Sequence, residues 1–405
     1  MKLKNKKIKH CLLCGNKILK NIFSLGNLFV SNFVEKKKIR KGIRAPLNLL
    51  YCKKCTLIQL SHIAPQEIMY KRFYWYRSGV TKTMKDGLKD LYKESLKFIN
   101  LKKNDVVLDI GANDGTLLNF YKNKKIKTIG CEPANNLKKY LKKKCDYVIS
   151  DFWNKENLDK ILIKNKLRKP KIITAIGMFY DLEKPNIFIK DAADSLADDG
   201  IFIAQLMCLK SMIEKNDLGN ICHEHIEFYS LKSLKYLFEN NGLEIFKIDE
   251  NDINGGSYRI YCRKFVKGSI KLKKENVLKM IDNFVKRIKS NKIKILDFIN
   301  KKQKNGKTFF LYGASTKGNT VLQYYGLNNE NIKYAAERSP EKWGKYTIGS
   351  GIKIISEKKA RQLNPDYFFV TPWGFIKEFV KRERKWLNKG GTFLVPFPKM
   401  KLIRK

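Results

Sequence analysis

The sequence predicts an α/β protein in three parts. A hydrophobic strand, a glycine-rich turn and a helix pattern follow one another twice, at residues 104–120 and at residues 308–320. This order is typical of a ligand-binding crossover at the carboxyl end of a parallel strand. Two C-x2-C pairs lie near the N-terminus, and a chain of 405 residues is too long for one ordinary domain. We therefore expect a cysteine-containing module at residues 1–70, a doubly wound sheet at residues 71–265 and a smaller α/β domain at residues 266–405.

The first glycine turn is the most informative segment of the chain. A strand at residues 106–108 ends in Asp109, the turn GANDG occupies residues 111–115, and a helix pattern begins at Leu117. Glycines at both ends of the turn let the backbone bend sharply and approach a ligand closely. The pattern D-x-G-x-N-x-G resembles motif I of class I S-adenosylmethionine (SAM) methyltransferases, whereas a dinucleotide favours G-x-G-x-x-G. SAM is therefore the expected cofactor, ahead of NAD and other nucleotides, and the expected contacts are Asp109, Gly111, Asn113 and Gly115.

Two further acids stand at the ends of the next two predicted strands. Residues 128–131 form a strand that ends in Glu132, and residues 147–150 form one that ends in Asp151. The carboxyl ends of parallel strands meet at one edge of a sheet, so we expect these acids near the glycine turn. Glu132 suits the two ribose hydroxyls of an adenosine ligand, and Asp151 suits the adenine amino group. An α/β core without a ligand would not require acids at three successive strand ends.

Four cysteines near the N-terminus predict a structural zinc site. They form the pairs Cys11–Cys14 and Cys52–Cys55, which together supply four thiolates for a tetrahedral ion. Because protein atoms would take all four positions, the zinc is expected to be structural rather than catalytic. Four reduced thiols without a metal are the alternative. The chain has nine cysteines in all, which in a long cytosolic protein argues for metal binding or free thiols rather than disulfides.

The net charge of +46 invites a nucleic-acid interpretation. Lysine far outnumbers arginine, however, and is spread along the chain beside abundant isoleucine and asparagine, a composition that an AT-rich coding bias also produces. Arginine, which contacts phosphates and bases bidentately, is scarce. We therefore expect no nucleic-acid partner. No apolar run is long enough to span a membrane and the basic N-terminus lacks a signal-peptide apolar region, so we expect no membrane partner and a cytoplasmic location.

Further strand patterns complete two sheets. In the central domain they occupy residues 171–176, 201–206, 243–248 and 257–262, and in the last domain residues 308–312, 367–370 and 392–395. The central set fits a seven-stranded methyltransferase sheet with a terminal antiparallel pair. Between the domains, apolar residues from Val277 to Ile288 recur at helical spacing and predict an amphipathic helix. The second glycine turn, at residues 313–320, is not a Walker loop. Its backbone N–H groups and Lys317 could still hold a phosphate, and a purely structural turn is the alternative.

The segment ICHEHIEFYS at residues 221–230 carries two of the four histidines. It follows the fifth strand and precedes a helix near Ser230, which places it on the carboxyl-end rim of the sheet, where a histidine is a candidate general base. If the segment is extended, His223 and His225 share a face and Glu224 points opposite. If it is a turn, Glu224 could instead orient a histidine. A buried, hydrogen-bonded histidine pair and a metal site that uses Cys222 are the alternatives.

The segment FYWYRSG at residues 73–79 is the second candidate for the substrate site. It joins the first two parts of the chain and interleaves aromatic residues with Arg77 and Ser78. Aromatic rings and hydroxyls beside a cofactor suit a substrate pocket. We expect Tyr76 to act in catalysis and Ser78 to contact the cofactor. An aromatic plug between two domains is the alternative.

Taken as a set, these motifs resemble the nucleotide-sugar C-methyltransferases of deoxysugar biosynthesis. The resemblance rests on the paired C-x2-C module, YWYRSG, LDIGANDG, HEHIEFYS and YGASTKGNT, and it covers nearly the whole chain. It implies an N-terminal zinc module, a central SAM domain and a C-terminal Rossmann-like domain. It also implies methylation at C3 of a dTDP-linked 4-keto deoxysugar. By match to the family's motif, His225 is implied as the base, with Glu224 and Tyr76 lining the sugar site.

The chain departs from that family at three positions. Cys222 stands where a tyrosine is usual, and Ile176 and Tyr180 stand where asparagine and histidine are usual. The sugar pocket is therefore expected to differ in detail, and a role in surface-polysaccharide sugars is implied. The sequence makes no prediction of the oligomeric state.

The predicted function is SAM-dependent C-methylation of a nucleotide-linked keto-deoxysugar through an enolate. Carbon is a poor nucleophile unless it carries negative charge, which a neighbouring ketone permits once an α-proton is removed. Each pKa unit of mismatch between that proton and its base costs about 1.4 kcal/mol, so hydrogen-bond donors must stabilise the oxyanion. We expect His225 to remove the proton while Tyr76 or His223 steadies the oxygen. The alternatives are an O- or N-methyltransferase of a sugar or small metabolite, and a zinc-ribbon nucleic-acid-binding protein.

Overall fold

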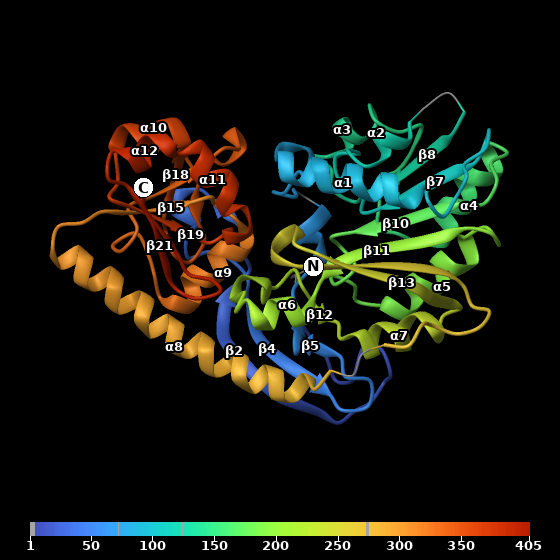
Figure 1. Cartoon of the computed structure of the whole chain (residues 1–405), viewed down its shortest axis with the longest axis horizontal. Helices are drawn as coiled ribbons and strands as arrows, with labels where there is room; N and C mark the ends of the chain where they lie inside the picture. Colours follow the sequence, from blue (N-terminus) through green and yellow to red (C-terminus); the bar gives the residue numbers. More distant parts are fainter. Residues whose placement is uncertain (1–4, 72, 123–124, 273–274) are drawn as a thin grey trace.

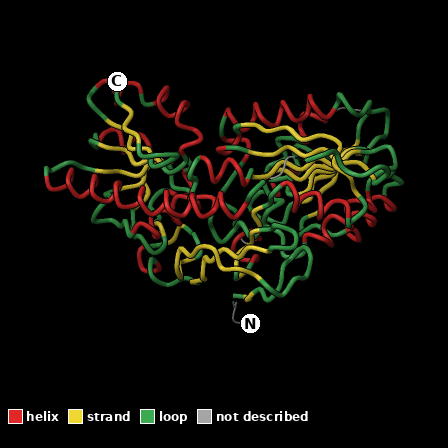
Figure 2. The backbone as a smooth tube through the Cα atoms, turned by 60° about the horizontal axis from the view of Figure 1, so that its bottom comes forward, coloured by secondary structure: helices red, strands yellow, loops and turns green. Residues whose placement is uncertain are grey.

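Two large sheets stand side by side in this computed structural model, and a third sheet lies below the junction between them (Figure 1). The structure describes residues 5–71, 73–122, 125–272 and 275–405. Figure 2 brings the lower side forward and shows helices flanking both large groups of strands. None of the helices within these ranges is long and apolar enough to cross a membrane.

The central sheet has seven strands in the order β13-β14-β11-β10-β7-β8-β9. Neighbours are parallel except for the pairs that β14 makes with β11 and β13, which is the predicted terminal antiparallel pair. The strands are β7 (Val106–Ile110), β8 (Lys127–Cys131), β9 (Tyr147–Ile149), β10 (Ile172–Ile176), β11 (Ile201–Met207), β13 (Leu243–Asn251) and β14 (Ser257–Lys264). The predicted class I SAM methyltransferase sheet is confirmed.

Helices cover both faces of the central sheet. Alternate strand residues point to opposite faces, so Val107 and Ile203 pack with one group of helices while Leu108 and Phe202 pack with the other. The first group is α1 (Lys82–Ser95), α2 (Leu118–Tyr121) and α3 (Lys138–Leu141); the second is α4 (Lys155–Lys164), α5 (Pro185–Ser195) and α7 (Leu231–Glu239). Because both faces are covered, the central strands read as continuous apolar runs. A short helix, α6 (Leu209–Glu214), follows β11.

The N-terminal sheet borrows a strand from the central part of the chain. Its order is β12-β5-β4-β2, and β12 comes from the histidine segment. The strands are β2 (Leu19–Phe29), β4 (Arg44–Cys52), β5 (Ile58–Leu60) and β12 (Glu227–Phe228), and a separate pair joins β1 (Lys6–Lys7) to β6 (His62–Ile63). Pairing of β12 with β5 ties the cysteine module directly to the segment that follows His225.

The C-terminal sheet is completed by a strand from the N-terminal segment. Its order is β21-β20-β19-β15-β16-β18-β17-β3, with β3 (Phe33–Val34) antiparallel to β17 (Tyr346–Thr347). The other strands are β15 (Phe309–Tyr312), β16 (Tyr334–Glu337), β18 (Lys353–Ser356), β19 (Tyr367–Val370), β20 (Thr392–Val395) and β21 (Lys401–Ile403). The helices are α9 (Thr316–Tyr325), α10 (Glu357–Leu363), α11 (Ile376–Arg382) and α12 (Arg384–Asn388). The predicted second Rossmann-like domain is present, although the boundaries at residues 70 and 265 stay a prediction.

The long helix α8 (Val277–Lys304) runs diagonally below the C-terminal domain and along the N-terminal sheet (Figure 1). Its buried side chains recur at helical spacing and include Ile281, Phe284 and Ile288, as the sequence predicted. Phe284 meets Phe23 of β2 edge to face at 6.4 Å. The helix therefore packs as ordinary core against the N-terminal sheet and helps to fix the three parts of the chain relative to one another.

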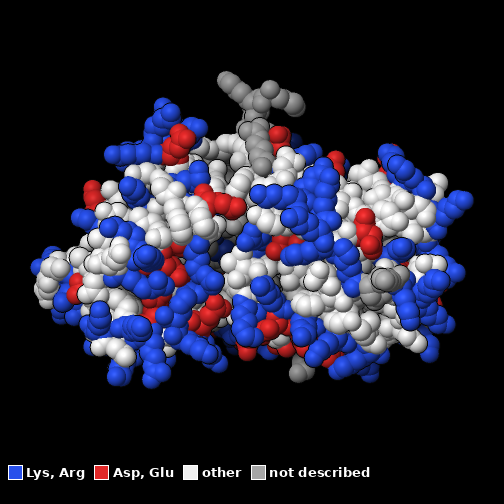
Figure 3. All heavy atoms as spheres, turned by 90° about the horizontal axis from the view of Figure 1, so that it is seen from above, with Lys and Arg blue, Asp and Glu red and all other residues white. Residues whose placement is uncertain are grey.

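Basic side chains are spread over the whole face of the molecule that Figure 3 shows, with acidic side chains among them. They do not gather there into one stripe or patch. On this face the +46 charge forms no dedicated stripe, and the expected absence of a nucleic-acid partner stays a prediction.

Candidate active site

One cavity of about 630 Å³ lies where the three parts of the chain meet. Its floor is formed by the carboxyl ends of β7, β8, β10 and β11, which is where ligands bind in open α/β sheets. Residues of the aromatic segment at 73–79 close one side, and the second glycine turn of the C-terminal domain closes another. The fold therefore brings motifs that are far apart in the sequence to one site.

The first glycine turn has the geometry that close approach to a ligand requires. Gly111 has a φ of +74°, and a Cβ atom there would lie 2.6 Å from Cγ of Met178. The Asn113 side chain fixes the turn to the aromatic segment, because its Oδ1 accepts from the Ser78 N–H (3.0 Å) and its Nδ2 donates to the Tyr76 carbonyl (3.2 Å). Gly111, Asn113 and Ser78 all line the cavity.

Two of the predicted acids, Asp109 and Glu132, line the same part of the cavity. Burial raises the pKa of Asp109 to about 7, although the Thr174 hydroxyl donates to its Oδ1 at 2.6 Å. Burial also raises the pKa of Glu132, whose two oxygens accept from the N–H groups of Asn113 (2.9 Å) and Ala134 (2.8 Å). These bonds hold the carboxylate in place and leave further lone pairs for ribose hydroxyls.

Two other expected cofactor contacts lie outside the cavity lining. Asp151 follows the edge strand β9, and its carboxylate is half-exposed and pairs with Lys71 at 3.0 Å. Its neighbours Phe152 and Trp153 line the cavity instead. Gly115 has a φ of +73° and packs against Leu141, so its role is to let the backbone of the turn adopt a left-handed conformation. The cofactor roles of Asp151 and Gly115 therefore stay predictions that the cavity lining does not support.

His225 lines the cavity as a neutral imidazole with a defined tautomer. Its Nδ1 lies 2.7 Å from the Asn220 carbonyl oxygen. Because a carbonyl only accepts, Nδ1 carries the hydrogen and the lone pair of the neutral ring is on Nε2. Burial, assisted by the positive charge of Lys317, lowers the pKa of His225 well below its usual range. The ring is therefore uncharged near neutral pH and able to accept a proton.

The part of the histidine segment that precedes β12 is a turn rather than a strand, and the two histidines separate. The backbone N–H of His225 donates to the backbone carbonyl of Cys222 at 3.2 Å. His223 is absent from the cavity lining, and its Nε2 donates to the Ala45 carbonyl of β4 at 2.9 Å. We therefore do not assign the oxyanion to His223. Glu224 lines the cavity, but its Oε2 accepts from the Thr316 hydroxyl (2.9 Å) rather than orienting a histidine.

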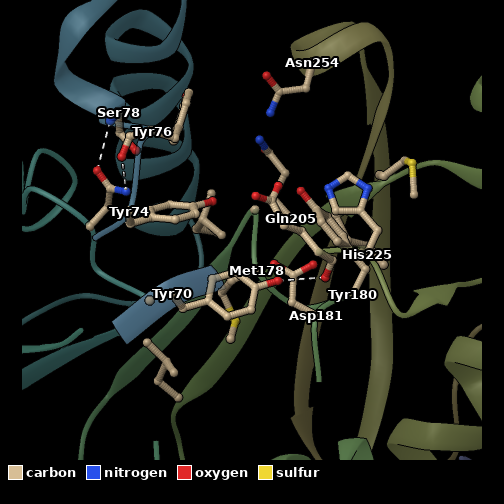
Figure 4. Close-up of a pocket in the computed structure, with 18 of the residues that line it drawn as sticks. Tyr70, Tyr74, Tyr76, Ser78, Met178, Tyr180, Asp181, Gln205, His225 and Asn254 are labelled. Carbon is tan, nitrogen blue, oxygen red and sulfur yellow. Dashed lines mark hydrogen bonds between the residues drawn. The ribbon is translucent and has the colours of Figure 1, made fainter. Parts of the chain in front are cut away.

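The aromatic segment, together with Tyr70 just before it, contributes both to the cavity wall and to a plug between domains. Figure 4 shows Tyr70 and Tyr74 pointing across the cavity toward the wall that carries Asp181, Tyr180 and His225. Tyr76 also lines the cavity and is 39% exposed. Trp75 instead packs edge to face on Phe33 of β3, with ring centroids 5.2 Å apart. The tyrosines therefore face the site, while Trp75 forms a plug toward the C-terminal domain.

The second glycine turn contributes directly to the cavity. The Ser315 hydroxyl caps α9 by accepting from the Gly318 N–H at 2.9 Å, and Lys317 Nζ donates to Asn220 Oδ1 at 2.6 Å. Thr371, at the end of β19, lies beside this turn, and its buried Oγ1 has no hydrogen-bond partner within the described residues. Ser315, Thr316 and Lys317 all line the cavity, so this turn is more than a structural duplicate.

Sequence reasoning missed several cavity residues that carry polar groups. Asp181 follows one predicted strand, Gln205 lies near the end of another, and Asn220 directly precedes the histidine segment. Position near a strand end was the one available signal, and many loop residues share it. Cys222 and His223 lie outside the lining, although Cys222, Glu224 and His225 place ligand atoms within 4.8 Å of one another.

The four N-terminal cysteines form one cluster, as predicted. Their sulfur atoms all lie within 4.8 Å of one another, with Cys11 and Cys55 separated by 3.4 Å and Cys14 and Cys52 by 3.5 Å. The hydrogen bond from Cys55 lowers the pKa of Cys11 to about 5. Four sulfurs at these separations suit a tetrahedral zinc ion with bonds of about 2.3 Å.

The sheet order, the glycine turn and the cavity at the strand ends together define a class I SAM-dependent methyltransferase. Three family models match successive parts of the chain: a zinc binding domain at residues 11–70, a methyltransferase domain at residues 76–248 and a C-methyltransferase C-terminal domain at residues 252–398. The C-methyltransferase NovU of Streptomyces niveus is 24% identical over 410 residues, covering 98% of this chain and 97% of NovU.

Solved structures of methyltransferases match a little under half of the chain. Magnesium protoporphyrin IX methyltransferase from Synechocystis PCC 6803, with bound SAH, is 10% identical and covers 47% of this chain and 91% of its own, with a TM-score of 0.36. An S-adenosylmethionine-dependent methyltransferase from Clostridium acetobutylicum is 12% identical and covers 45% of this chain and 91% of its own, with a TM-score of 0.32.

The chain is a SAM-dependent methyltransferase that resembles C-methyltransferases along nearly its whole length, with a zinc-binding module, a methyltransferase domain and a C-terminal domain in the same order as the three matching models. Its cofactor is SAM, as the methyltransferase-domain match and the glycine turn indicate, and its metal is zinc at the four-cysteine cluster.

Proposed function

We propose that the enzyme methylates a carbon beside the ketone of a nucleotide-linked keto-deoxysugar, and that the reaction passes through an enolate. One observation carries the proposal. A single cavity holds the contacts expected for SAM at the ends of β7 and β8 together with His225, whose free lone pair is on Nε2. A base beside the cofactor is what methylation beside a ketone requires, because the α-carbon becomes a nucleophile only when its proton is removed.

His225 is the proposed base. Its Nε2 takes the α-proton, the C–H electron pair forms the carbon–carbon double bond of the enolate, and the carbonyl electrons move onto oxygen. The Asn220 carbonyl holds the ring through Nδ1 and stabilises the positive charge that the imidazole gains. SAM supplies the electrophilic methyl group. Because the pKa of His225 is low, the oxyanion needs strong hydrogen-bond donors to make the enolate accessible.

The walls beside His225 suit a sugar. Tyr74, Tyr76 and Glu224 all line the cavity and present ring faces and polar oxygens. Tyr180 packs edge to face on the His225 ring, with centroids 4.4 Å apart, which restricts the orientation of the base. Aromatic walls with a few fixed polar groups are typical of small-molecule sites.

The C-terminal turn suits the phosphates of the nucleotide carrier. The start of α9 places the positive end of a helix dipole at the cavity, and Lys317 adds a full positive charge. The buried Thr371 hydroxyl beside this turn has no partner among the described residues and is available to a phosphate oxygen. This arrangement supports a substrate with an anionic carrier rather than a free sugar.

Exchange of the substrate α-proton with solvent tests the proposal. Zinc-loaded enzyme is incubated in deuterium oxide with a dTDP-linked 4-keto-deoxysugar and SAH, which occupies the cofactor site without transferring a methyl group. We expect wild-type enzyme to introduce deuterium at the carbon beside the ketone, and His225→Asn to abolish this while still binding SAM. His223→Asn is the matched control, because His223 bonds β4 outside the cavity. Exchange by His225→Asn at the wild-type rate would overturn the base assignment.

A further inference from the structure

The carboxyl group of Asp181 is buried at the cavity with an unused oxygen. Asp181 lies in the loop that follows β10, is 8% exposed, and lines the cavity. Its Oδ1 has no hydrogen-bond partner anywhere in the described ranges. A carboxylate can only accept, and burying an ionised oxygen without a donor is costly. The protonated carboxyl avoids that cost and gains an O–H group that a ligand can use.

The loop holds Asp181 in place through its backbone. The Asp181 N–H donates to the Met178 carbonyl (3.1 Å), and the Asp181 carbonyl accepts from the Gln66 amide (3.0 Å). The neighbouring Tyr180 carbonyl accepts from the N–H groups of Ile226 (2.8 Å) and Glu227 (3.0 Å). The backbone is thus tied to two other segments, and the carboxyl group is presented to the cavity from a fixed position.

The groups that face Asp181 come from four segments and are mostly acidic or aromatic. They are Tyr70 and Tyr74 from the segment before α1, Tyr180 from its own loop, Glu224, His225 and Cys222 from the histidine turn, and Lys317 from α9. Burial, and then the negative charge of Glu224, raise the pKa of Asp181 well above its usual range, while the charge of Lys317 and the nearby Tyr70 hydroxyl oppose them. Glu227 lies nearby on β12 and adds a further acid.

Asp181 and His225 stand on the same wall of the cavity. Figure 4 shows both beside Tyr180, with Tyr70 and Tyr74 opposite. In a ketone the α-carbon and the oxygen are two bonds apart, so a base and a donor on one wall can address both at once. We propose that Asp181 is a catalytic residue that donates a hydrogen bond to the carbonyl oxygen of the keto sugar while His225 removes the neighbouring proton. The inference rests on the proposed function.

The step is balanced without any further reactant. The α-proton moves to Nε2 of His225, the C–H pair becomes the carbon–carbon double bond, and the carbonyl π pair becomes an oxygen lone pair. Asp181 keeps its proton and shares it with the oxyanion. A neutral acid as the oxyanion donor compensates for a base whose pKa is low, because it stabilises the charge that the base alone cannot.

A pair of substitutions separates donation from shape. Asp181→Asn keeps a planar group that can donate, and Asp181→Leu keeps the volume but removes the donor. We expect Asp181→Leu to exchange deuterium about 100-fold or more slowly than wild type, which is the usual effect of losing one oxyanion donor. The rate of Asp181→Asn should stay within about tenfold of the wild-type rate. Wild-type exchange should fall at high pH as Asp181 ionises, and Asp181→Asn should lack that fall because its amide does not titrate. Asp194→Asn is the control and should leave exchange at the wild-type rate, because Asp194 pairs with Lys190 on α5 and is not among the lining residues.

The outcomes distinguish this inference from the proposed function. Zinc content and SAM affinity establish that each variant is folded, and if Asp181→Leu fails that check, the pH profile of Asp181→Asn decides. Exchange by Asp181→Leu at the wild-type rate, a variant that raises KM alone, or an unchanged alkaline fall in Asp181→Asn would overturn the role of Asp181 and leave His225 as the base. A wild-type enzyme that exchanges no proton would overturn the proposed function itself.

Discussion

The protonation state of Asp109 should control how tightly the enzyme binds SAM. Asp109 is buried at the end of β7 beneath the glycine turn, and its pKa is raised to about 7. SAM carries a sulfonium and an ammonium group, so an ionised Asp109 attracts it and a protonated one does not. Raising the pH ionises Asp109 and should therefore tighten binding, and lowering the pH should weaken it.

The magnitude follows from the pKa. With a value of about 7, Asp109 is about 76% ionised at about pH 7.5 and about 3% ionised at about pH 5.5. If only the ionised form binds, the affinity falls about 25-fold between these pH values, which corresponds to about 1.9 kcal/mol. Isothermal titration calorimetry of zinc-loaded enzyme with SAM at several pH values measures this directly.

Two variants identify the titrating group. Asp109→Asn should bind SAM weakly and with little pH dependence across that range. Glu132→Gln should keep the dependence but move it to lower pH, because Asp109 still titrates while the negative charge of Glu132, which helps to raise the pKa of Asp109, is gone. Equal SAM affinity at about pH 5.5 and about pH 7.5 in the wild type, or an undiminished slope in Asp109→Asn, would refute the reasoning.

Three further substitutions test other parts of the site. Gly111→Ala forces a side chain into a left-handed conformation that costs about 1–2 kcal/mol and into Cγ of Met178, so SAM affinity measured by calorimetry should fall about tenfold or more; unchanged affinity would show that the turn does not contact the cofactor. Cys55→Ser should lose the bound zinc and lower the melting temperature by about 10 °C, as measured by metal analysis and calorimetry; retention of one zinc per chain would contradict the four-cysteine site. Lys317→Met should raise KM for the nucleotide sugar about tenfold or more with little change in kcat, because it removes a charge-assisted hydrogen bond to phosphate; an unchanged KM in steady-state kinetics would place the phosphates elsewhere.

The parts of the fold that repeat a local pattern were predictable from sequence. Strands buried on both faces read as apolar runs, and a glycine turn followed by a helix marked β7 and β15. Adjacent parallel strands must end at one edge, so the sequence alone was sufficient to place Asp109 and Glu132 together. The helix that begins after Ser230 was marked by its cap, whose hydroxyl accepts from the Ser233 N–H.

The parts that depend on long-range pairing were not predictable. Strands β3 and β12 have two residues each, too few for a period-two pattern, and each joins a sheet built from another part of the chain. Whether His223 and His225 share a face depended on a turn whose sequence also fits a strand. Asp181 reaches the cavity because its loop is tied to Gln66 and to β12, and no local spacing reports such contacts.

Identification of the methylated atom tests the central claim most directly. The zinc-loaded enzyme is supplied with SAM carrying a carbon-13 methyl group and with a dTDP-linked 4-keto-deoxysugar, and the product is examined by NMR. The account predicts one labelled methyl group bonded to the carbon beside the ketone, resonating upfield of any O- or N-methyl group, and no product from His225→Asn. A labelled methyl group on oxygen or nitrogen, or a carbon-methylated product formed equally well without His225, would contradict it.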